Sequence, residues 1–248
     1  MYNATRTRFT KADFEFIAQT LGEDVQQQYA ILQLTSDPVV VTDLLHKKKL
    51  FERSMTVPPV FLSISPQLFF YVFVYQALDR KRLADDDVVD YVAGICVEFR
   101  ASHSLWQFSG KEERNVCGVD LLSLLADVDR HQQYFLRRHI GNVSLFLTGF
   151  FPDFIFQRSK KKGAPPIEYY ENLGRSQYGT AADESLTYDA NAAPVLNTLA
   201  DRFGDIRAAL NLYADSYLNL HNQKSAIDTI ERQASTLDEE SFRQSLEF

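Results

Sequence analysis

The residues best suited to binding chemistry are two histidines that fall on apolar helical stripes. His103 lies four residues after Phe99, and His139 lies four residues after Phe135, so each imidazole extends the inward side of an expected helix. Two imidazoles that converge in a bundle core can ligate a metal ion or a haem. A buried histidine bonded to a backbone carbonyl or a carboxylate explains the same pattern and is the commoner arrangement. The sequence leaves both interpretations open.

A tyrosine-rich segment, YYENLGRSQYG at residues 169–179, is the second candidate for a binding site. Aromatic faces beside Arg175 can form a pocket for an anionic or planar ligand. Alternatively, the rings pack on the core while the hydroxyls and the guanidinium satisfy buried polar groups. Combined with the two histidines, this segment predicts a ligand pocket lined by His103, His139, Tyr170 and Arg175.

The motifs that would make an enzymatic function specific are missing from the sequence. It contains no GxGxxG or GxxxxGK[ST] loop, no GxSxG nucleophile motif, and no HExxH or CxxC metal motif. The two cysteines, Cys96 and Cys117, form no ligand cluster. We therefore expect no cofactor and no metal, assign no catalytic residue, and leave open whether the chain is an enzyme.

Two strongly apolar segments, residues 66–78 and 142–156, must supply much of the core. Ser65 and Pro66 before the first segment, PQLFFYVFVYQAL, are typical of a helix start. Its apolar residues cover the whole circumference of a helix, so other helices must enclose it. A buried strand is the alternative, because the run is aromatic and β-branched. The second segment is too short to span a bilayer and is expected in the core.

The most regular pattern runs from Leu196 to Leu220, where apolar residues recur at spacings of three and four on an expected single helix, residues 194–220. The preceding segment, residues 179–194, is polar with weak periodicity, and we interpret it as a loop or linker. The apolar stripe either packs against its own domain or contacts a protein partner or a second copy of the chain. The residues predicted to make such a contact are Leu199, Phe203, Ile206, Leu210, Tyr213 and Tyr217.

The charge of the chain is unevenly distributed. The net charge is −7, with +1 on residues 1–162 and −8 on residues 163–248. Nucleic-acid binding is not favoured, because no dominant basic field is present. No segment reaches the roughly 18 consecutive apolar residues of a spanning helix, and no secretory signal is evident, so we expect no membrane insertion and a cytoplasmic location. Attachment to a membrane surface through apolar segments and neighbouring Lys and Arg is a third possibility.

These observations predict an all-α protein, a multi-helix globular bundle of about seven to nine helices with a buried central helix and a long C-terminal helix. Residues 1–182 are expected to form a helical core domain, and residues 183–248 a long helix and tail packed on the core or on a partner. The leading function hypothesis is a non-enzymatic, cytoplasmic interaction or regulatory protein. It binds a protein partner, or itself, through the 196–220 helix, or meets a partner through the tyrosine-rich helix at residues 169–178. The alternative is a small-ligand or metal-binding helical protein, or an enzyme, that uses the predicted pocket.

Overall fold

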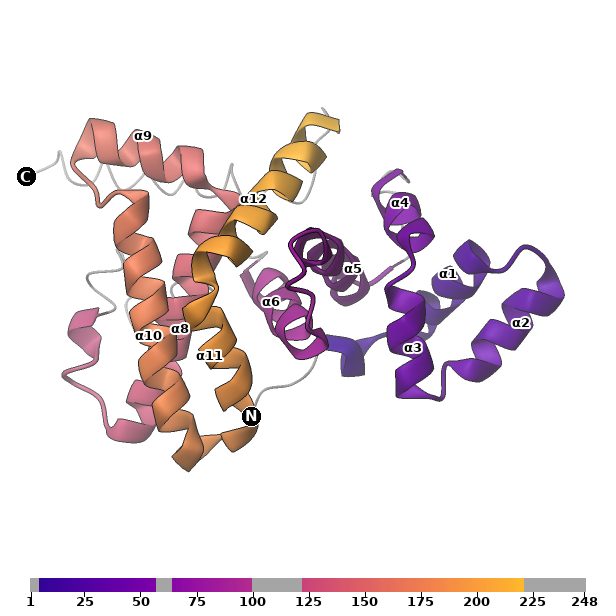
Figure 1. Cartoon of the computed structure of the whole chain (residues 1–248), viewed down its shortest axis with the longest axis horizontal. Helices are drawn as coiled ribbons and strands as arrows, with labels where there is room; N and C mark the ends of the chain where they lie inside the picture. Colours follow the sequence, from indigo (N-terminus) through magenta and orange to yellow (C-terminus); the bar gives the residue numbers. More distant parts are fainter. Residues whose placement is uncertain (1–4, 57–63, 100–121, 221–248) are drawn as a thin grey trace, which may run out of the picture. The chain divides into compact units, whose positions relative to one another are not determined.

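The computed structural model describes residues 5–56, 64–99 and 122–220, and every regular element in those ranges is helical (Figure 1). The prediction of an all-α protein is confirmed. The chain forms two compact units, residues 1–97 (unit 1) and residues 98–248 (unit 2). The predicted helix count and the single body built around one buried central helix are not confirmed. None of the helices in the described ranges is long and apolar enough to cross a bilayer.

Unit 1 is a set of short helices joined by tight connections. Its elements are η1 (Thr5–Arg8), α1 (Lys11–Leu21), α2 (Val25–Leu34), α3 (Pro38–Leu45), α4 (Lys48–Thr56), α5 (Pro66–Asp79) and α6 (Asp86–Phe99), the last of which ends in unit 2. The first turn of α1 is closed by a capping box, since the backbone N–H of Thr10 donates to Asp13 Oδ2 over 2.7 Å. Asp13 is fully buried, and its Oδ1 also accepts the N–H of Ser65 over 2.6 Å. One carboxylate therefore joins the starts of α1 and α5.

The apolar segment at residues 66–78 is a helix, α5, and not a strand. Ser65 caps it by accepting the N–H of Leu68 at its hydroxyl over 3.2 Å, and Pro66 occupies the first turn. Most of its side chains are buried, and the buried ones lie on every side of the helix: Leu68, Phe70, Tyr71, Val72, Phe73, Val74, Ala77 and Leu78. This burial is what a helix without a polar face requires.

Unit 2 is built on two long helices that pack along each other (Figure 1). Its elements are α8 (Arg130–Phe150), α9 (Pro152–Lys162), α10 (Ile167–Tyr188), η4 (Ala190–Ala192), α11 (Ala193–Asp201) and α12 (Phe203–Leu220). Arg137 on α8 contacts Glu184 near the end of α10, whereas Asn142, further along α8, contacts Tyr178, which comes earlier in α10. The two helices are therefore antiparallel.

The prediction of a loop or linker at residues 179–194 is wrong, because α10 continues to Tyr188. The buried side chains of α10 beyond Gly179 are small ones, Ala181, Ala182 and Ser185, and small side chains give little hydrophobic periodicity. They let α11 approach closely: a Cβ placed on Gly179 would lie 4.0 Å from the Cβ of Ala200. The predicted division of the chain at residue 182 stays a prediction, and position 182 lies inside α10.

The expected single helix at residues 194–220 is interrupted at Arg202, which separates α11 from α12. The carboxylate of Glu171 lies against the first turn of α12, where a Cβ on Gly204 would come within 2.5 Å of its Oε1. Arg207, one turn further along, holds the other oxygen of Glu171 at 3.4 Å from its Nε. A carboxylate at a helix N-terminus is electrostatically favourable, so the break creates a favourable position for Glu171.

Candidate functional site

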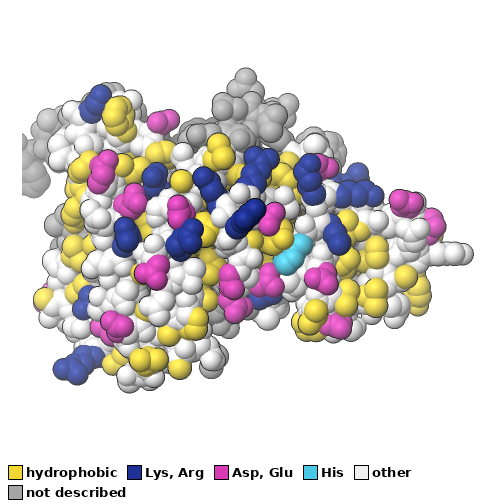
Figure 2. Space-filling model, in the orientation of Figure 1, with side chains coloured by type: hydrophobic (Ala, Val, Ile, Leu, Met, Phe, Trp, Pro, Cys, Tyr) yellow, Lys and Arg dark blue, Asp and Glu magenta, His cyan; other side chains and the backbone are white. Residues whose placement is uncertain are grey.

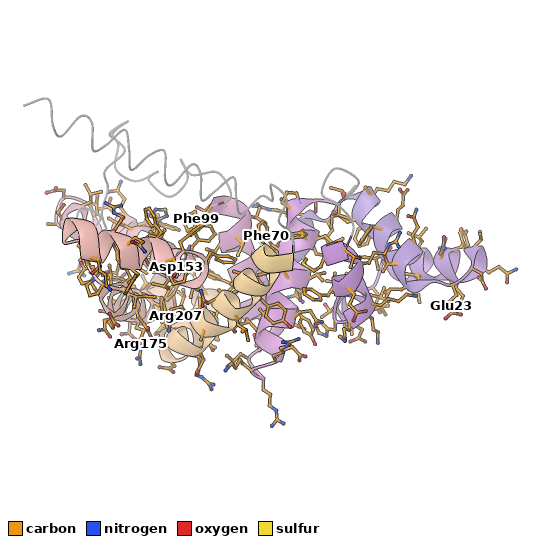
Figure 3. All side chains as sticks on the ribbon, turned by 90° about the horizontal axis from the view of Figure 1, so that it is seen from above. Glu23, Phe70, Phe99, Asp153, Arg175 and Arg207 are labelled. Atoms are coloured by element: carbon orange, nitrogen blue, oxygen red, sulfur yellow. The ribbon has the colours of Figure 1, made fainter. Side chains whose placement is uncertain are left out.

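The residues predicted to line a ligand pocket occupy different environments in unit 2. His139, on α8, is buried with its ring edge-on to Phe99, at 5.6 Å between ring centroids. Tyr170, on α10, is half-buried beside Tyr169, whereas Arg175 is exposed (Figure 3). His103 lies outside the described residues. The four-residue pocket therefore stays a prediction, and within the described ranges no group of three or more His, Cys, Asp or Glu is placed to hold a metal ion.

The apolar stripe predicted for a partner is covered by the helices of its own unit. Leu199, Phe203 and Ile206 are 0% exposed, Leu210 is 1% exposed and Tyr213 is 7% exposed. Phe203 fits against Gly174 of α10, and Leu210 fits against Gly149 of α8, where an added Cβ would lie 3.3 Å from the leucine side chain. The side chain of Tyr217 is outside the described part of the chain. Packing within unit 2 thus accounts for the described stripe, and its use by a partner stays a prediction.

A network of charged groups surrounds Asp90 in unit 1. The Asp90 side chain is 1% exposed, and its two oxygens accept the backbone N–H groups of Thr5 and Arg6, each over 2.9 Å. The guanidinium of Arg6 adds an ion pair, with its Nε 3.4 Å from Asp90 Oδ1, and also reaches Asp87 over 3.2 Å. A buried carboxylate needs such partners, because desolvation of an unpaired charge is costly. The network therefore fastens η1 to α6.

His46 extends this network at the C-terminal end of α3. Its Nε2 lies 3.0 Å from Asp86 Oδ1, and its ring stacks on Tyr75 at 3.9 Å between centroids. A histidine–aspartate pair can serve as a general base when a reacting hydroxyl meets the other ring nitrogen. The neighbouring hydroxyl of Thr42 instead donates to the carbonyl of Pro38 and accepts from Arg6. The described contacts support a structural role for His46, which lies between the end of α3 and the start of α4.

Tyr71 is the residue of this region whose polar group has no partner among the described residues. Its side chain is fully buried, and its hydroxyl forms no hydrogen bond there. Burial raises the pKa of Tyr71 well above its ordinary value, although the nearby Arg6 charge opposes that shift. Cys96 is also buried, and burial raises the pKa of its thiol, which disfavours the nucleophilic thiolate form. Neither group has the lowered pKa of an activated nucleophile.

A different kind of site lies on α2 and the start of α3, the α2–α3 surface, which we define as Val25, Tyr29, Leu34 and Val39. These side chains are 79%, 65%, 51% and 70% exposed, and no residue of α2 is buried. The apolar residues Ile31 and Leu32 of α2 are half-buried. Figure 2 shows hydrophobic side chains on the surface where Figure 1 places these helices. Val25 and Tyr29 are four residues apart and lie on one side of α2, and exposed apolar side chains that gather on one face can mark a binding site.

Sequence reasoning did not identify the α2–α3 surface or the Asp90 network. The first had a visible signal, since residues 25–36 contain no charged residue between Asp24 and Asp37. The second had only the spacing of Asp86 and Asp90 on one side of a helix, which an exposed acidic helix also shows. Comparison of the chain with known protein families, with curated proteins and with solved structures finds no match.

Proposed function

We propose that this chain is a non-enzymatic, cytoplasmic helical protein that works by binding a protein partner. The observation that supports the proposal is the α2–α3 surface. A helix as short as α2 is marginal in water by itself, and it buries none of its residues in unit 1. Full burial of a large apolar side chain contributes about 1.5–3 kcal/mol. A partner that covered Val25, Tyr29, Leu34 and Val39 would therefore gain affinity and stabilise α2.

The 196–220 segment is the second candidate for partner or self contact. Leu212 on α12 is 50% exposed, on the side of the helix away from the buried stripe. A partner that bound this segment while unit 2 stayed closed would use the side that carries Leu212. We rank this contact below the α2–α3 surface, because it has one exposed large apolar side chain in the described part of α12.

The rival function is ligand or metal binding at His103, His139, Tyr170 and Arg175. The observation that supports this rival function is the half-buried pair Tyr169 and Tyr170 on α10. Elemental analysis and an absorption spectrum of the purified protein test it. A stoichiometric metal ion or chromophore would favour this rival over the interaction role.

Site-specific photo-crosslinking tests the interaction role. We would place a photoreactive phenylalanine analogue at Tyr29 and, as a matched control, at Tyr188, an exposed tyrosine of unit 2. We expect a defined crosslinked partner at position 29 and none at position 188. The purified partner should bind the unmodified chain, and Tyr29→Lys should weaken that binding at least about tenfold, as expected for an aromatic anchor. The proposal fails if the crosslinked protein, once purified, does not bind, or if Tyr29→Lys has no effect.

A further inference from the structure

We infer that the α2–α3 surface binds an amphipathic helical segment of another protein, one whose apolar side chains are flanked by Lys and Arg. This inference rests on the proposed function above and adds the chemistry of the partner. It starts from the charges around the surface. Between Lys11 and Lys47 the chain contains no Lys or Arg, and it contains six acidic residues there: Asp13, Glu15, Glu23, Asp24, Asp37 and Asp43.

Four of these acidic residues are exposed around α2 and α3, namely Glu23, Asp24, Asp37 and Asp43. Asp24 caps α2 by accepting the N–H of Gln27 over 2.8 Å, and Asp37 caps α3 by accepting the N–H of Val39 over 2.9 Å. Glu23 projects at the start of α2 (Figure 3). Among the described residues, none of the four forms an ion pair with Lys or Arg. The apolar surface is thus bounded by negative charge that unit 1 leaves without a basic partner in the described ranges.

The apolar positions suit a helical partner. Val25, Tyr29 and the half-buried Leu32 follow one another at spacings of four and three residues, so they share one face of α2. An amphipathic helix that packs along this face would present its own apolar residues at the same spacing. Tyr29 supplies a large, rigid contact, and aromatic side chains of this kind are common anchors in protein interfaces.

The negative charge around the α2–α3 surface discriminates among the partners that an exposed apolar surface could bind. A second copy bound through the same surface would bring four more exposed carboxylates against these four, and like charges oppose such a contact. An anionic membrane would be repelled for the same reason. A segment with Lys and Arg beside its apolar stripe instead gains electrostatic complementarity, which raises the association rate and the specificity.

Synthetic peptides test this inference on the full chain. The first peptide carries Leu at helical spacing with flanking Lys, the second has the same Leu positions with flanking Glu, and the third keeps Lys but replaces Leu by Ser. We would measure binding by fluorescence anisotropy at low and at high salt. We expect the first peptide to bind at least about tenfold more tightly than either of the others, because both apolar and charge complementarity are needed. Its affinity should fall with added salt.

Two double variants of the chain test which residues bind the first peptide. Val25→Ser with Tyr29→Ser should weaken the first peptide about tenfold, as expected for loss of apolar anchors. Glu23→Gln with Asp24→Asn should weaken it less and reduce its salt dependence, and Asn keeps the helix cap. The matched control is Asp183→Asn with Asp201→Asn, which removes the same charge from exposed positions of unit 2. The control should leave affinity unchanged, and an equal loss would show that only net charge matters and would overturn the inference.

Other results overturn the inference in favour of a different occupant. These are equal binding of the Lys and Glu peptides, self-association in sedimentation experiments that Tyr29→Ser abolishes, and co-sedimentation with phosphatidylserine vesicles that Tyr29→Ser abolishes. The proposed function is tested separately by crosslinking at Tyr29. If that experiment identifies a genuine partner without a basic amphipathic segment, the inference fails while the interaction role stands.

Discussion

Helices α2 and α12 both carry apolar side chains at helical spacing, yet the structure uses them in opposite ways. In α12, Phe203, Ile206 and Leu210 are buried within unit 2, whereas in α2 Val25 and Tyr29 are exposed. The difference lies in how closely the neighbouring helices pack against each of the two helices. A regular apolar stripe therefore does not distinguish an internal contact from a partner contact, and the surrounding packing decides.

Glycines on the neighbouring helices provide the close packing in unit 2. The ring of Tyr178 lies over Gly141, where an added Cβ would come within 2.7 Å of the ring, and Phe203 lies against Gly174. No side chain of α2 is enclosed in this way. Substitutions at the two helices should therefore separate stability from binding.

Leu210→Lys should strongly destabilise unit 2. The substitution puts a charge where the leucine is 1% exposed, and it should lower the free energy of unfolding by about 4 kcal/mol. Tyr29→Lys is the matched change on α2, and a surface substitution should cost at most about 0.5 kcal/mol. Urea unfolding followed by circular dichroism measures both. Equal costs would mean that α2 is packed in solution or that the α12 stripe is not.

Asp90→Asn should destabilise the attachment of η1 to α6 in unit 1. An amide offers one acceptor oxygen in place of two and removes the charge that Arg6 faces, so we expect a loss of about 3 kcal/mol. Asp87→Asn is the control, because its carboxylate is exposed and its ion pair should contribute about 0–1 kcal/mol. Hydrogen exchange should show earlier exchange of the Thr5 and Arg6 amides in the Asp90 variant. A mild effect at Asp90 would show that η1 is held by other contacts.

Gly174→Ala tests the close packing in unit 2. The added methyl group would collide with the ring of Phe203, and overpacking of this kind should cost about 2 kcal/mol. Gly179→Ala, on the same helix, meets Ala200 at an ordinary contact distance and should be neutral or stabilise by up to about 1 kcal/mol. Thermal unfolding of the two variants gives the difference. If both behave alike, the interlocking of α10 and α12 is looser than the structure indicates.

The sequence predicted the helical class, the helix at residues 66–78 and the cap at Ser65, because these depend on local signals. It did not predict the continuation of α10 through Gly179, since that helix is stabilised by small buried residues that show no hydrophobic period. It also did not predict the exposure of α2. Whether an apolar face is covered depends on contacts between distant segments. The spacing of apolar residues along the chain gives no information about those contacts.

The smallest expected changes in stability come from substitutions at two fully buried tyrosines, Tyr178 and Tyr71. The hydroxyl of Tyr178 donates to Asn142 Oδ1 over 2.9 Å, so Tyr178→Phe should cost about 1 kcal/mol. The hydroxyl of Tyr71 has no hydrogen-bond partner among the described residues, so Tyr71→Phe should be neutral or stabilise by up to about 1 kcal/mol. Chemical unfolding at neutral pH measures both.

Tyr71→Phe should also change how the stability of the protein depends on pH in alkali. Burial raises the pKa of Tyr71 in the folded state, so the unfolded chain loses this proton first, at about pH 10. The stability that depends on the neutral phenol is complete below that pH and is lost as the pH rises toward the folded-state pKa. Tyr71→Phe should therefore reduce the fall in stability above about pH 10, because phenylalanine does not titrate. An unchanged alkaline profile would mean that the Tyr71 hydroxyl has access to solvent, and unit 1 would then be open around α5 as well as at α2.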